Sequence, residues 1–192
     1  MDYLLYRLSD LPAGDDALLD ATERAAAEKR GDRYRRIRCV LKRELARRCG
    51  CTPQEVQFSI GTHGKLHFAA QPFNISHSGD LLCMAFHEGG IGVDIQEHRS
   101  RISAGLSKRI MTAEQYAAYE ERGCPAQEFF DCWCAAEALV KQAGDSIWNV
   151  HKYPYRYENG RIIPLFENAP HIKLFTPAPG FSGAVAYRPV FS

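Results

Sequence analysis

A regular alternation of hydrophobic and polar positions marks the centre of the chain, where residues 73–96 read FNISHSGDLLCMAFHEGGIGVDIQ. A polar segment at 74–79 precedes an apolar run, and the triplet Glu88-Gly89-Gly90 separates this run from a second one. Turn residues that bracket two segments of strand length predict a β-hairpin that follows a polar turn.

The second apolar run, residues 91–96, has the period of a half-buried strand. Its isoleucine and valine side chains fall on one face and Gly92, Asp94 and Gln96 fall on the other, because side chains alternate along a strand. A carboxylate beside an amide on a sheet face has two interpretations. Asp94 lies on the solvent face of an ordinary strand, or it belongs to a site that uses its charge.

A second informative stretch, residues 129–144, reads FFDCWCAAEALVKQAG and predicts a helix that ends at Gly144. Trp133, Glu137 and Lys141 are spaced four residues apart and therefore form one line along this helix. The alternative for Glu137 and Lys141 is an ordinary surface ion pair worth roughly 0.2–0.5 kcal/mol. The alternative for Trp133 is core packing.

The rest of the chain predicts a mixture of helices and short strands. Before the central stretch we expect a strand at 3–8, a helix capped by Asp15 or Asp16 that runs to residue 30, a helix at about 33–49, and strands at 54–60 and 66–68 around a turn at 61–65. After it we expect a loop to Ser107 that leads into a short helix, and a second helix at 113–120 opened by the capping box Thr112–Gln115. Strands are expected at 153–157, 161–163, 171–175 and 182–188, with Asn159-Gly160 as a hairpin turn.

Composition is that of a globular protein, with 45% hydrophobic and 24% charged residues and a net charge of +1 over 192 residues. This length suffices for one substantial domain or for two small packed halves. No apolar run approaches the roughly 20 residues that a membrane helix needs, and the N-terminus lacks the pattern of a signal peptide. We therefore expect no membrane association and a cytoplasmic location.

The seven cysteines are an odd number and include no C-x-x-C pair. Cys132 and Cys134 are two apart on the predicted helix, so they point in different directions and cannot chelate one ion. Reduced, structural thiols are the expectation.

Positive charge is concentrated in residues 24–48, which contain eleven Lys and Arg against three acidic residues. Nucleic-acid binding is not expected, because the aromatic residues needed for stacking on bases are scarce in this segment. A compact polyanion such as a nucleotide fits the charge better. A solvated basic helix face is the alternative for any single arginine here.

Taken in order, the two informative stretches resemble the 4′-phosphopantetheinyl transferases of the surfactin-synthetase-activating type. That family carries an N-x-SHS turn, a G-[IV]-D-[IV]-E strand and a W-[STC]-x-K-E-[AS]-x-x-K helix, which match residues 74–78, 92–96 and 133–141. Phe58-Ser59 and Gly64-Lys65 resemble the strand and G-K-P turn of the family. The resemblance covers residues 28–144. It departs from the pattern at Gln96, usually a glutamate, and at Ala136, usually a lysine.

The resemblance implies an α+β fold of two similar halves related by a pseudo-two-fold, each a helix packed on a small antiparallel sheet. The N-terminal half would be residues 1–90, with the basic helices and the SHS turn. The C-terminal half would be residues 91–192, with the metal-binding strand and the motif helix. Two such halves would make a monomer sufficient.

The activity implied by the resemblance is Mg²⁺-dependent transfer of the 4′-phosphopantetheine group from coenzyme A to a serine of an apo acyl or peptidyl carrier protein, with release of 3′,5′-ADP. Displacement at a diphosphate needs a hard cation to bridge its oxygens, and Mg²⁺ prefers one or two carboxylates together with waters and phosphate oxygens. The metal ligands implied are Asp94, Gln96 and Glu137.

The remaining roles follow from the same resemblance. Glu137, Lys141 and His77 would be catalytic, with Glu137 or a water that it orients taking the serine proton and Lys141 neutralising the transferring phosphate. The residues implied for coenzyme A binding are Lys29, Arg38, Lys65, Ser76, His77 and Lys141, with Lys29 and Arg38 at the 3′-phosphate and adenine end. A structural histidine in a polar turn is the alternative for His77.

Two other hypotheses remain open. One is a non-catalytic relative that binds coenzyme A or a carrier protein, favoured by Gln96 and Ala136. The other, without the family, is a metal-dependent phosphoryl-transfer or phosphodiesterase domain that uses Asp94 and Glu137.

Overall fold

The N-terminal part of the chain forms a strand, a helical layer and two further strands. The structure is a computed structural model that describes residues 1–61, 64–100, 102 and 104–190. The elements of this part are β1 (Asp2–Arg7), α1 (Ala21–Arg30), α2 (Asp32–Cys49), β2 (Ser59–Ile60), β3 (Leu66–His67), β4 (Phe73–Ser78) and β5 (Leu81–Phe86), with 3₁₀ turns at Asp16–Leu18 and Pro53–Glu55. Strands β1, β5 and β4 form an antiparallel sheet in that spatial order.

The C-terminal part repeats this order of elements. Its elements are β6 (Ile91–Glu97), α3 (Ala104–Ile110), α4 (Ala113–Glu121), α5 (Ala126–Ala143), a 3₁₀ segment (Ile147–Lys152), β7 (Tyr155–Glu158), β8 (Arg161–Pro164), β9 (His171–Phe175) and β10 (Phe181–Tyr187). Strands β6, β10 and β9 form an antiparallel sheet, so in both sheets the last strand of the unit lies between the other two. The α+β class is confirmed, with several small antiparallel sheets.

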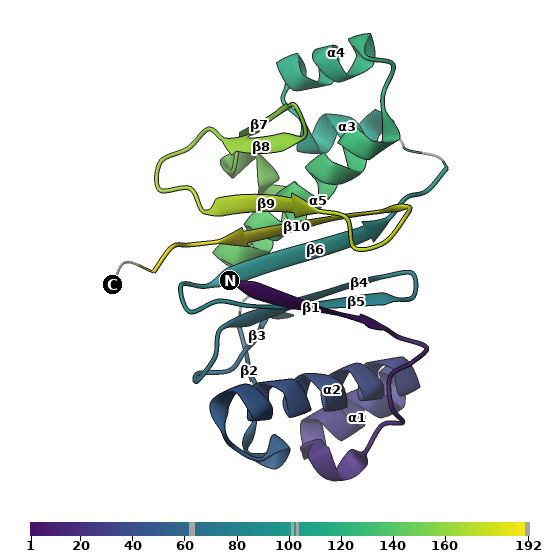
Figure 1. The fold of residues 1–192 in the computed structure, drawn as a ribbon, viewed down its shortest axis with the longest axis vertical. Helices are drawn as coiled ribbons and strands as arrows, with labels where there is room; N and C mark the ends of the chain where they lie inside the picture. Colours follow the sequence, from purple (N-terminus) through teal and green to yellow (C-terminus); the bar gives the residue numbers. More distant parts are fainter. Residues whose placement is uncertain (62–63, 101, 103, 191–192) are drawn as a thin grey trace.

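The two sheets lie face to face between two long helices (Figure 1). On the outer side of the first sheet, Leu82, Met84 and Phe86 pack with Leu41 and Leu45 of α2. Its inner side contributes β5 residues to a cluster with alternate residues of β6. The outer face of the second sheet packs against α5 in the largest cluster. Alternation along β5 and β6 thus sends successive side chains into different layers.

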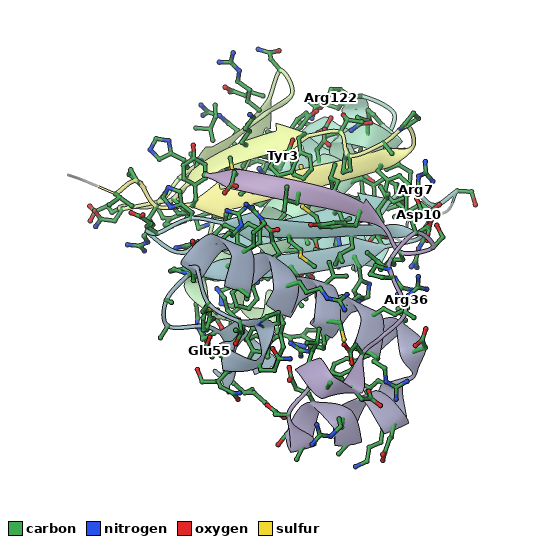
Figure 2. All side chains as sticks on the ribbon, turned by 60° about the horizontal axis from the view of Figure 1, so that its bottom comes forward. Tyr3, Arg7, Asp10, Arg36, Glu55 and Arg122 are labelled. Atoms are coloured by element: carbon green, nitrogen blue, oxygen red, sulfur yellow. The ribbon has the colours of Figure 1, made fainter. Side chains whose placement is uncertain are left out.

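Strand β1 also reaches the second sheet. The ring of Tyr3 stacks on Phe175 of β9 with centroids 4.4 Å apart, and Figure 2 shows Tyr3 on the strand beside the C-terminal strands. Arg36 of α2 donates hydrogen bonds to the carbonyl oxygens of Ser9 and Pro12 and so ties the segment after β1 to the helix. The N-terminal strand is therefore fixed on both sides.

The two sheets are joined by polar side chains of β4. Asn74 Oδ1, Ser76 Oγ and Ser78 Oγ accept hydrogen bonds from the backbone N–H groups of three alternate β6 residues, at 2.8, 3.3 and 3.0 Å; the donors are Val93, Ile95 and Glu97. The other edge of β6 pairs with β10. These three side chains, which we call the β4 side-chain ladder, therefore take the place of a neighbouring strand at this edge.

Gly92 lets α5 approach the second sheet closely. A Cβ at this position would lie 2.1 Å from the carbonyl oxygen of Ala138 and 2.4 Å from the backbone nitrogen of Gln142. Residues 92, 94 and 96 share this face of β6, so the close approach brings α5 to the side of the strand that carries Asp94.

Two predictions about the central stretch are wrong. The segment 74–79 is not a turn up to Ser78, because residues 73–78 form β4 and the bend is at Gly79 and Asp80. The two apolar runs are not a hairpin, because β5 pairs with β1 and β4 whereas β6 pairs with β10. The Glu88-Gly89-Gly90 triplet instead carries the chain from one sheet to the other.

Two predictions in the N-terminal part are also wrong. The first long helix begins after Asp20, which forms a capping box with Glu23, whereas Asp15 caps only the short 3₁₀ turn. The strand expected at 54–60 shrinks to Ser59–Ile60 because a 3₁₀ turn begins at Pro53. Of the turn expected at 61–65, residues 62 and 63 lie outside the described residues, as do residues 101 and 103 of the expected loop.

Most other element predictions are confirmed to within about three residues at each end. Gly144 ends α5 in a left-handed conformation with φ 71°, and Thr112 and Gln115 form the expected capping box. Asn159 and Gly160, with φ 48° and 74°, turn the hairpin of β7 and β8. Among the described residues, none of the helices combines the length and apolarity needed to cross a membrane.

Replacing Gly92 by alanine tests the close approach of α5. We expect Gly92→Ala to lower the free energy of unfolding by about 3 kcal/mol, the upper end of the usual cost of overpacking, because the added methyl group meets backbone atoms that only a shift of the helix can move. Gly50→Ala is the matched control: its surroundings are open and its φ is 67°, so only backbone strain of about 1 kcal/mol is expected. Urea unfolding measures both, and a smaller loss for Gly92→Ala than for Gly50→Ala contradicts the argument.

Candidate active site

Asp94 is the centre of the candidate site. Its side chain is buried on β6, and its Oδ1 atom accepts hydrogen bonds from Ser76 Oγ and from Lys141 Nζ, both at 2.7 Å. Both donors reach the same oxygen, and the buried thiol of Cys134 also hydrogen-bonds to this carboxylate. A carboxylate has about four acceptor positions, so Asp94 keeps acceptor capacity for a further ligand. β4, β6 and α5 each contribute one group to this arrangement.

Lys141 is the positive charge of the site. Its ammonium group pairs with Asp94 and also donates to the carbonyl oxygen of Val93 at 3.3 Å. Burial by itself would lower the pKa of Lys141, but the carboxylates of Asp94 and Glu137 outweigh burial and raise this pKa. The ammonium group therefore stays charged at neutral pH.

Glu137 lies one turn before Lys141 on α5 and is half-buried. Burial raises the pKa of Glu137; the charge of Lys141 opposes this rise and that of Asp94 adds to it. Among the described residues its carboxylate has no hydrogen-bond or ion-pair partner. Both of its oxygens are therefore available, and the group is held nearer to neutrality than an exposed glutamate.

Gln96 shares the α5 side of β6 with Asp94. Its Nε2 atom donates to Ser78 Oγ and to the carbonyl oxygen of Glu97, each at 3.1 Å. Both amide hydrogens are thereby used, and the side-chain oxygen is left without a partner among the described residues. Asp94, Gln96 and Glu137 thus each have an oxygen to offer.

Ser76 and His77 point to opposite faces of β4. Ser76 is buried and bonded to β6, whereas the exposed His77 lies on the α2 side, where its Nδ1 is 3.1 Å from Nη2 of Arg33. Burial of the imidazole ring and the neighbouring Arg33 charge lower the pKa of His77. The ring is therefore neutral at pH 7, and it is the Arg33–His77 pair that faces solvent at the start of α2.

Lys65 and Lys141 come together at the end of α5. The ammonium group of Lys65 donates to the carbonyl oxygens of Ile91, at 3.3 Å, and of Lys141. Burial and the neighbouring Lys141 charge lower the pKa of Lys65. In this arrangement Lys65 links the β2–β3 hairpin to the second sheet and to α5.

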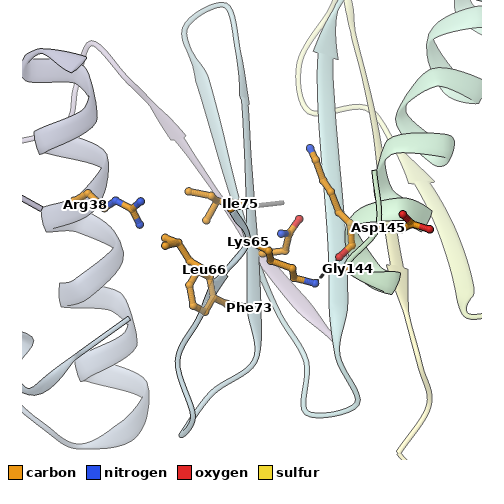
Figure 3. A pocket seen from close by; sticks show the side chains of 10 residues that line it. Arg38, Lys65, Leu66, Phe73, Ile75, Gly144 and Asp145 are labelled. Carbon is orange, nitrogen blue, oxygen red and sulfur yellow. Dashed lines mark hydrogen bonds between the residues drawn. The ribbon is translucent and has the colours of Figure 1, made fainter. Parts of the chain in front are cut away.

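A cavity of about 260 Å³ begins beside this lysine pair. Its walls include Arg38, Leu66, Phe73, Ile75 and Asp145. Figure 3 shows Arg38 reaching from α2 toward Ile75, with Lys65 on the other side near Gly144. The cavity therefore has a cation at each end and apolar side chains between them.

Arg38 has an unused donor in this cavity. Its guanidinium group lies between the rings of Tyr34 and Phe58, at 4.8 and 5.5 Å from their centroids. Its Nη1 atom is buried and has no hydrogen-bond partner among the described residues. A buried N–H group without an acceptor is costly, so this position suits an incoming anion.

Lys29 is not part of this grouping. It is exposed in the last turn of α1, a helix that packs on α2 and lies on its far side from the sheets (Figure 1). The structure thus brings together Asp94, Glu137 and Lys141 and places Gln96 two residues further along the same face of β6, with its amide bonded to Ser78. Lys65 and Arg38 lie along the adjoining cavity, and His77 lies on another face. Position 136 is fully buried in the cluster between α5 and the second sheet.

The sequence did not reveal the positions of three residues around the candidate site. Asn74 and Ser78 were included in a turn, although the spacing of Asn74, Ser76 and Ser78 at every second residue is the signal of one strand face. Arg33 carried no signal beyond its place in the basic segment. Among the described residues, no group of three or more His, Cys, Asp or Glu side chains is arranged so that it could hold a metal ion by itself.

Comparison with known proteins gives consistent results. The family model of the 4′-phosphopantetheinyl transferase superfamily matches residues 90–177 of this chain. The Bacillus pumilus 4′-phosphopantetheinyl transferase is 34% identical over 160 residues, covering 78% of this chain and 68% of its own. A protein of Synechocystis sp., provisionally named a 4′-phosphopantetheinyl transferase, is 31% identical over 175 residues, covering 77% of this chain and 70% of its own.

A further relative and a solved structure extend the comparison. A second 4′-phosphopantetheinyl transferase, from Bacillus subtilis, is 31% identical over 148 residues, 71% of this chain and 66% of its own. The crystal structure of Thermotoga maritima holo-[acyl-carrier-protein] synthase matches with a TM-score of 0.40 and 18% identity over 53% of this chain and 64% of that one. The assignment rests on the sequence relatives, two of which are at least 30% identical and are covered over more than two thirds of their length. The chain belongs to the 4′-phosphopantetheinyl transferase superfamily.

Proposed function

We propose that this chain transfers the 4′-phosphopantetheine group from coenzyme A to a serine hydroxyl of an acyl or peptidyl carrier protein and releases 3′,5′-ADP, with Mg²⁺ as cofactor. The observation that carries the proposal is the grouping of Asp94, Glu137 and Lys141 where β6 meets α5. Two carboxylates and an ammonium group in one partly buried place are what a displacement at a diphosphate requires.

The residues present fit a magnesium ion. Mg²⁺ is held by one or two carboxylates together with waters and substrate phosphates, so a large set of protein ligands is not needed. The carboxylates of Asp94 and Glu137 and the side-chain oxygen of Gln96 would hold it. Held there, the metal would supply Lewis-acid stabilisation of the charge that develops on the leaving phosphate.

Lys141 and Glu137 have separate tasks in this proposal. The charged ammonium group of Lys141 faces the transferring phosphate and offsets its charge. Glu137 accepts the proton of the attacking serine, directly or through a water that it orients.

The cavity beside Lys141 would take the coenzyme A end of the substrate. Arg38 is oriented by Tyr34 and Phe58 and has an unused N–H group, which supports phosphate binding there. Lys65 would have to exchange its bonds to Ile91 and Lys141 for bonds to phosphate. The roles of Lys29, Ser76 and His77 in coenzyme A binding stay predictions.

Several further statements stay predictions of the family resemblance. The equal strand orders of the two sheets support the division into halves 1–90 and 91–192. A monomer and a cytoplasmic location are predicted from sequence. The complete burial of position 136 means that Ala136 takes part in packing, so this departure from the family pattern does not argue against transfer.

Intact-mass measurement tests the proposed reaction. Incubation with coenzyme A, Mg²⁺ and a panel of apo carrier proteins should add about 340 Da, one phosphopantetheine group, to a carrier serine, and a chelator should prevent this. Glu137→Gln should reduce the rate at least about a hundredfold without loss of stability, since general-base catalysis contributes about that much or more. Glu114→Gln, an exposed change on α4, is the control. No mass gain on any carrier, with coenzyme A still bound, would favour the non-catalytic relative.

Coenzyme A affinity tests the role of Arg38. We expect Arg38→Ala to weaken binding by between about tenfold and a hundredfold, the range for a lost hydrogen bond to a charged group. Arg43→Ala is the matched control on the same helix, because Arg43 is outside the cavity and its nearest acidic partner, Asp15, is 4.0 Å away. Calorimetric titration with coenzyme A measures both, and equal losses for the two variants would remove Arg38 from the binding site.

A further inference from the structure

Ser78 is the last residue of the β4 side-chain ladder. It contacts Gln96, the residue that departs from the family pattern. Its Oγ atom accepts hydrogen bonds from the backbone nitrogen of Glu97 at 3.0 Å and from Nε2 of Gln96 at 3.1 Å. The two acceptor positions of this hydroxyl are therefore both used. Ser78 holds a backbone group and a side chain of β6 at the same time.

The second hydrogen of the Gln96 amide is also fixed. Nε2 donates to the carbonyl oxygen of Glu97 at 3.1 Å, so the amide group lies between two acceptors. The Glu97 carbonyl oxygen can only accept, so the atom of the amide that faces it must be the nitrogen. The side-chain oxygen of Gln96 is consequently turned away from both.

The same contacts disfavour a carboxylate at position 96. A glutamate there has no N–H group, and one of its oxygens would lie against the Glu97 carbonyl oxygen, with only the Ser78 hydroxyl proton to offer a bond. Two adjacent acceptors without a proton between them repel. The surroundings of position 96 are thus matched to an amide.

We propose that Ser78 is a positioning residue which, together with the Glu97 carbonyl group, orients the Gln96 amide so that its oxygen faces the metal position beside Asp94. The inference rests on the proposed function, in which Gln96 is a metal ligand. It adds that a neutral ligand is held ready before the ion arrives, so that less side-chain freedom is lost on binding.

Two readouts other than turnover follow from this arrangement. In the metal-free protein, the side-chain amide protons of Gln96 should exchange slowly and give well-dispersed NMR signals, and Ser78→Ala should remove this protection. Ser78→Thr keeps the accepting hydroxyl and should retain it. Assignment is made by loss of the signals in Gln96→Ala.

Metal affinity provides the second readout, with Mn²⁺ alone as the probe and the electron paramagnetic resonance signal of the free ion as the measure. Ser78→Ala should weaken Mn²⁺ binding by about threefold to tenfold, the range for one net hydrogen bond. In a Gln96→Ala background the same change should have less than about a twofold effect, because Ser78 then has no ligand to position.

The outcomes separate the positioning role from the proposed function. An equal loss on Ser78→Ala in both backgrounds would show that Ser78 acts only through the fold and would overturn the inference, with Gln96 still a ligand. Unchanged affinity in Gln96→Ala would remove Gln96 from the metal site and would overturn the inference together with that part of the proposed function. Loss of affinity that depends on Gln96, together with exposed amide protons in Ser78→Ala, supports it.

Discussion

The packing of the two sheets depends on the hydrogen-bond acceptors available to the edge of β6 that pairs with no other strand. A buried backbone N–H group without an acceptor costs about 1–3 kcal/mol, and the edge of β6 opposite β10 would leave two of them, those of Val93 and Ile95, followed by the exposed N–H group of Glu97. Asn74, Ser76 and Ser78 satisfy them from β4, through side-chain oxygens. Because side chains recur at every second residue of both strands, the match fixes the register of one sheet on the other.

That register places the charged groups. Ser76 meets Ile95 N and Asp94 Oδ1 at once, so the bond that joins the sheets also orients the central carboxylate. Gly92 then admits α5 to the same face of β6, which brings Lys141 to within 2.7 Å of Asp94. A partly buried ion pair of this kind is weak evidence for added stability, since both ions lose hydration. Its value to the molecule lies in the position of the charges rather than in the free energy of unfolding.

Sequence reasoning could predict the parts of this arrangement that are local. The helix ending at Gly144, the capping box at Thr112 and the hairpin at Asn159-Gly160 depend on neighbouring residues, and all three were predicted correctly. The pairing of β6 with β10 could not be predicted, because about 90 residues separate the partners and the Glu88-Gly89-Gly90 triplet has the composition of a hairpin turn. The family resemblance named Asp94 and Glu137, but nothing in their spacing showed that α5 would reach β6; that approach requires the small residue at position 92.

The polar segment at 74–78 shows why a motif and its geometry must be separated. As a turn, its serines and histidine would converge on one ligand, which is the interpretation that composition favours. As a strand, it divides them: Ser76 and Ser78 join β6, and His77 lies on the α2 side beside Arg33. The histidine and the serines therefore lie at different places, and only the serines contact Asp94 and Gln96. The strand geometry also explains the residue at position 96. An amide there donates hydrogen bonds to the Ser78 hydroxyl and to the Glu97 carbonyl oxygen, whereas a carboxylate has no N–H group to donate. The departure from the family pattern at this position is thus a local match between a side chain and its neighbours.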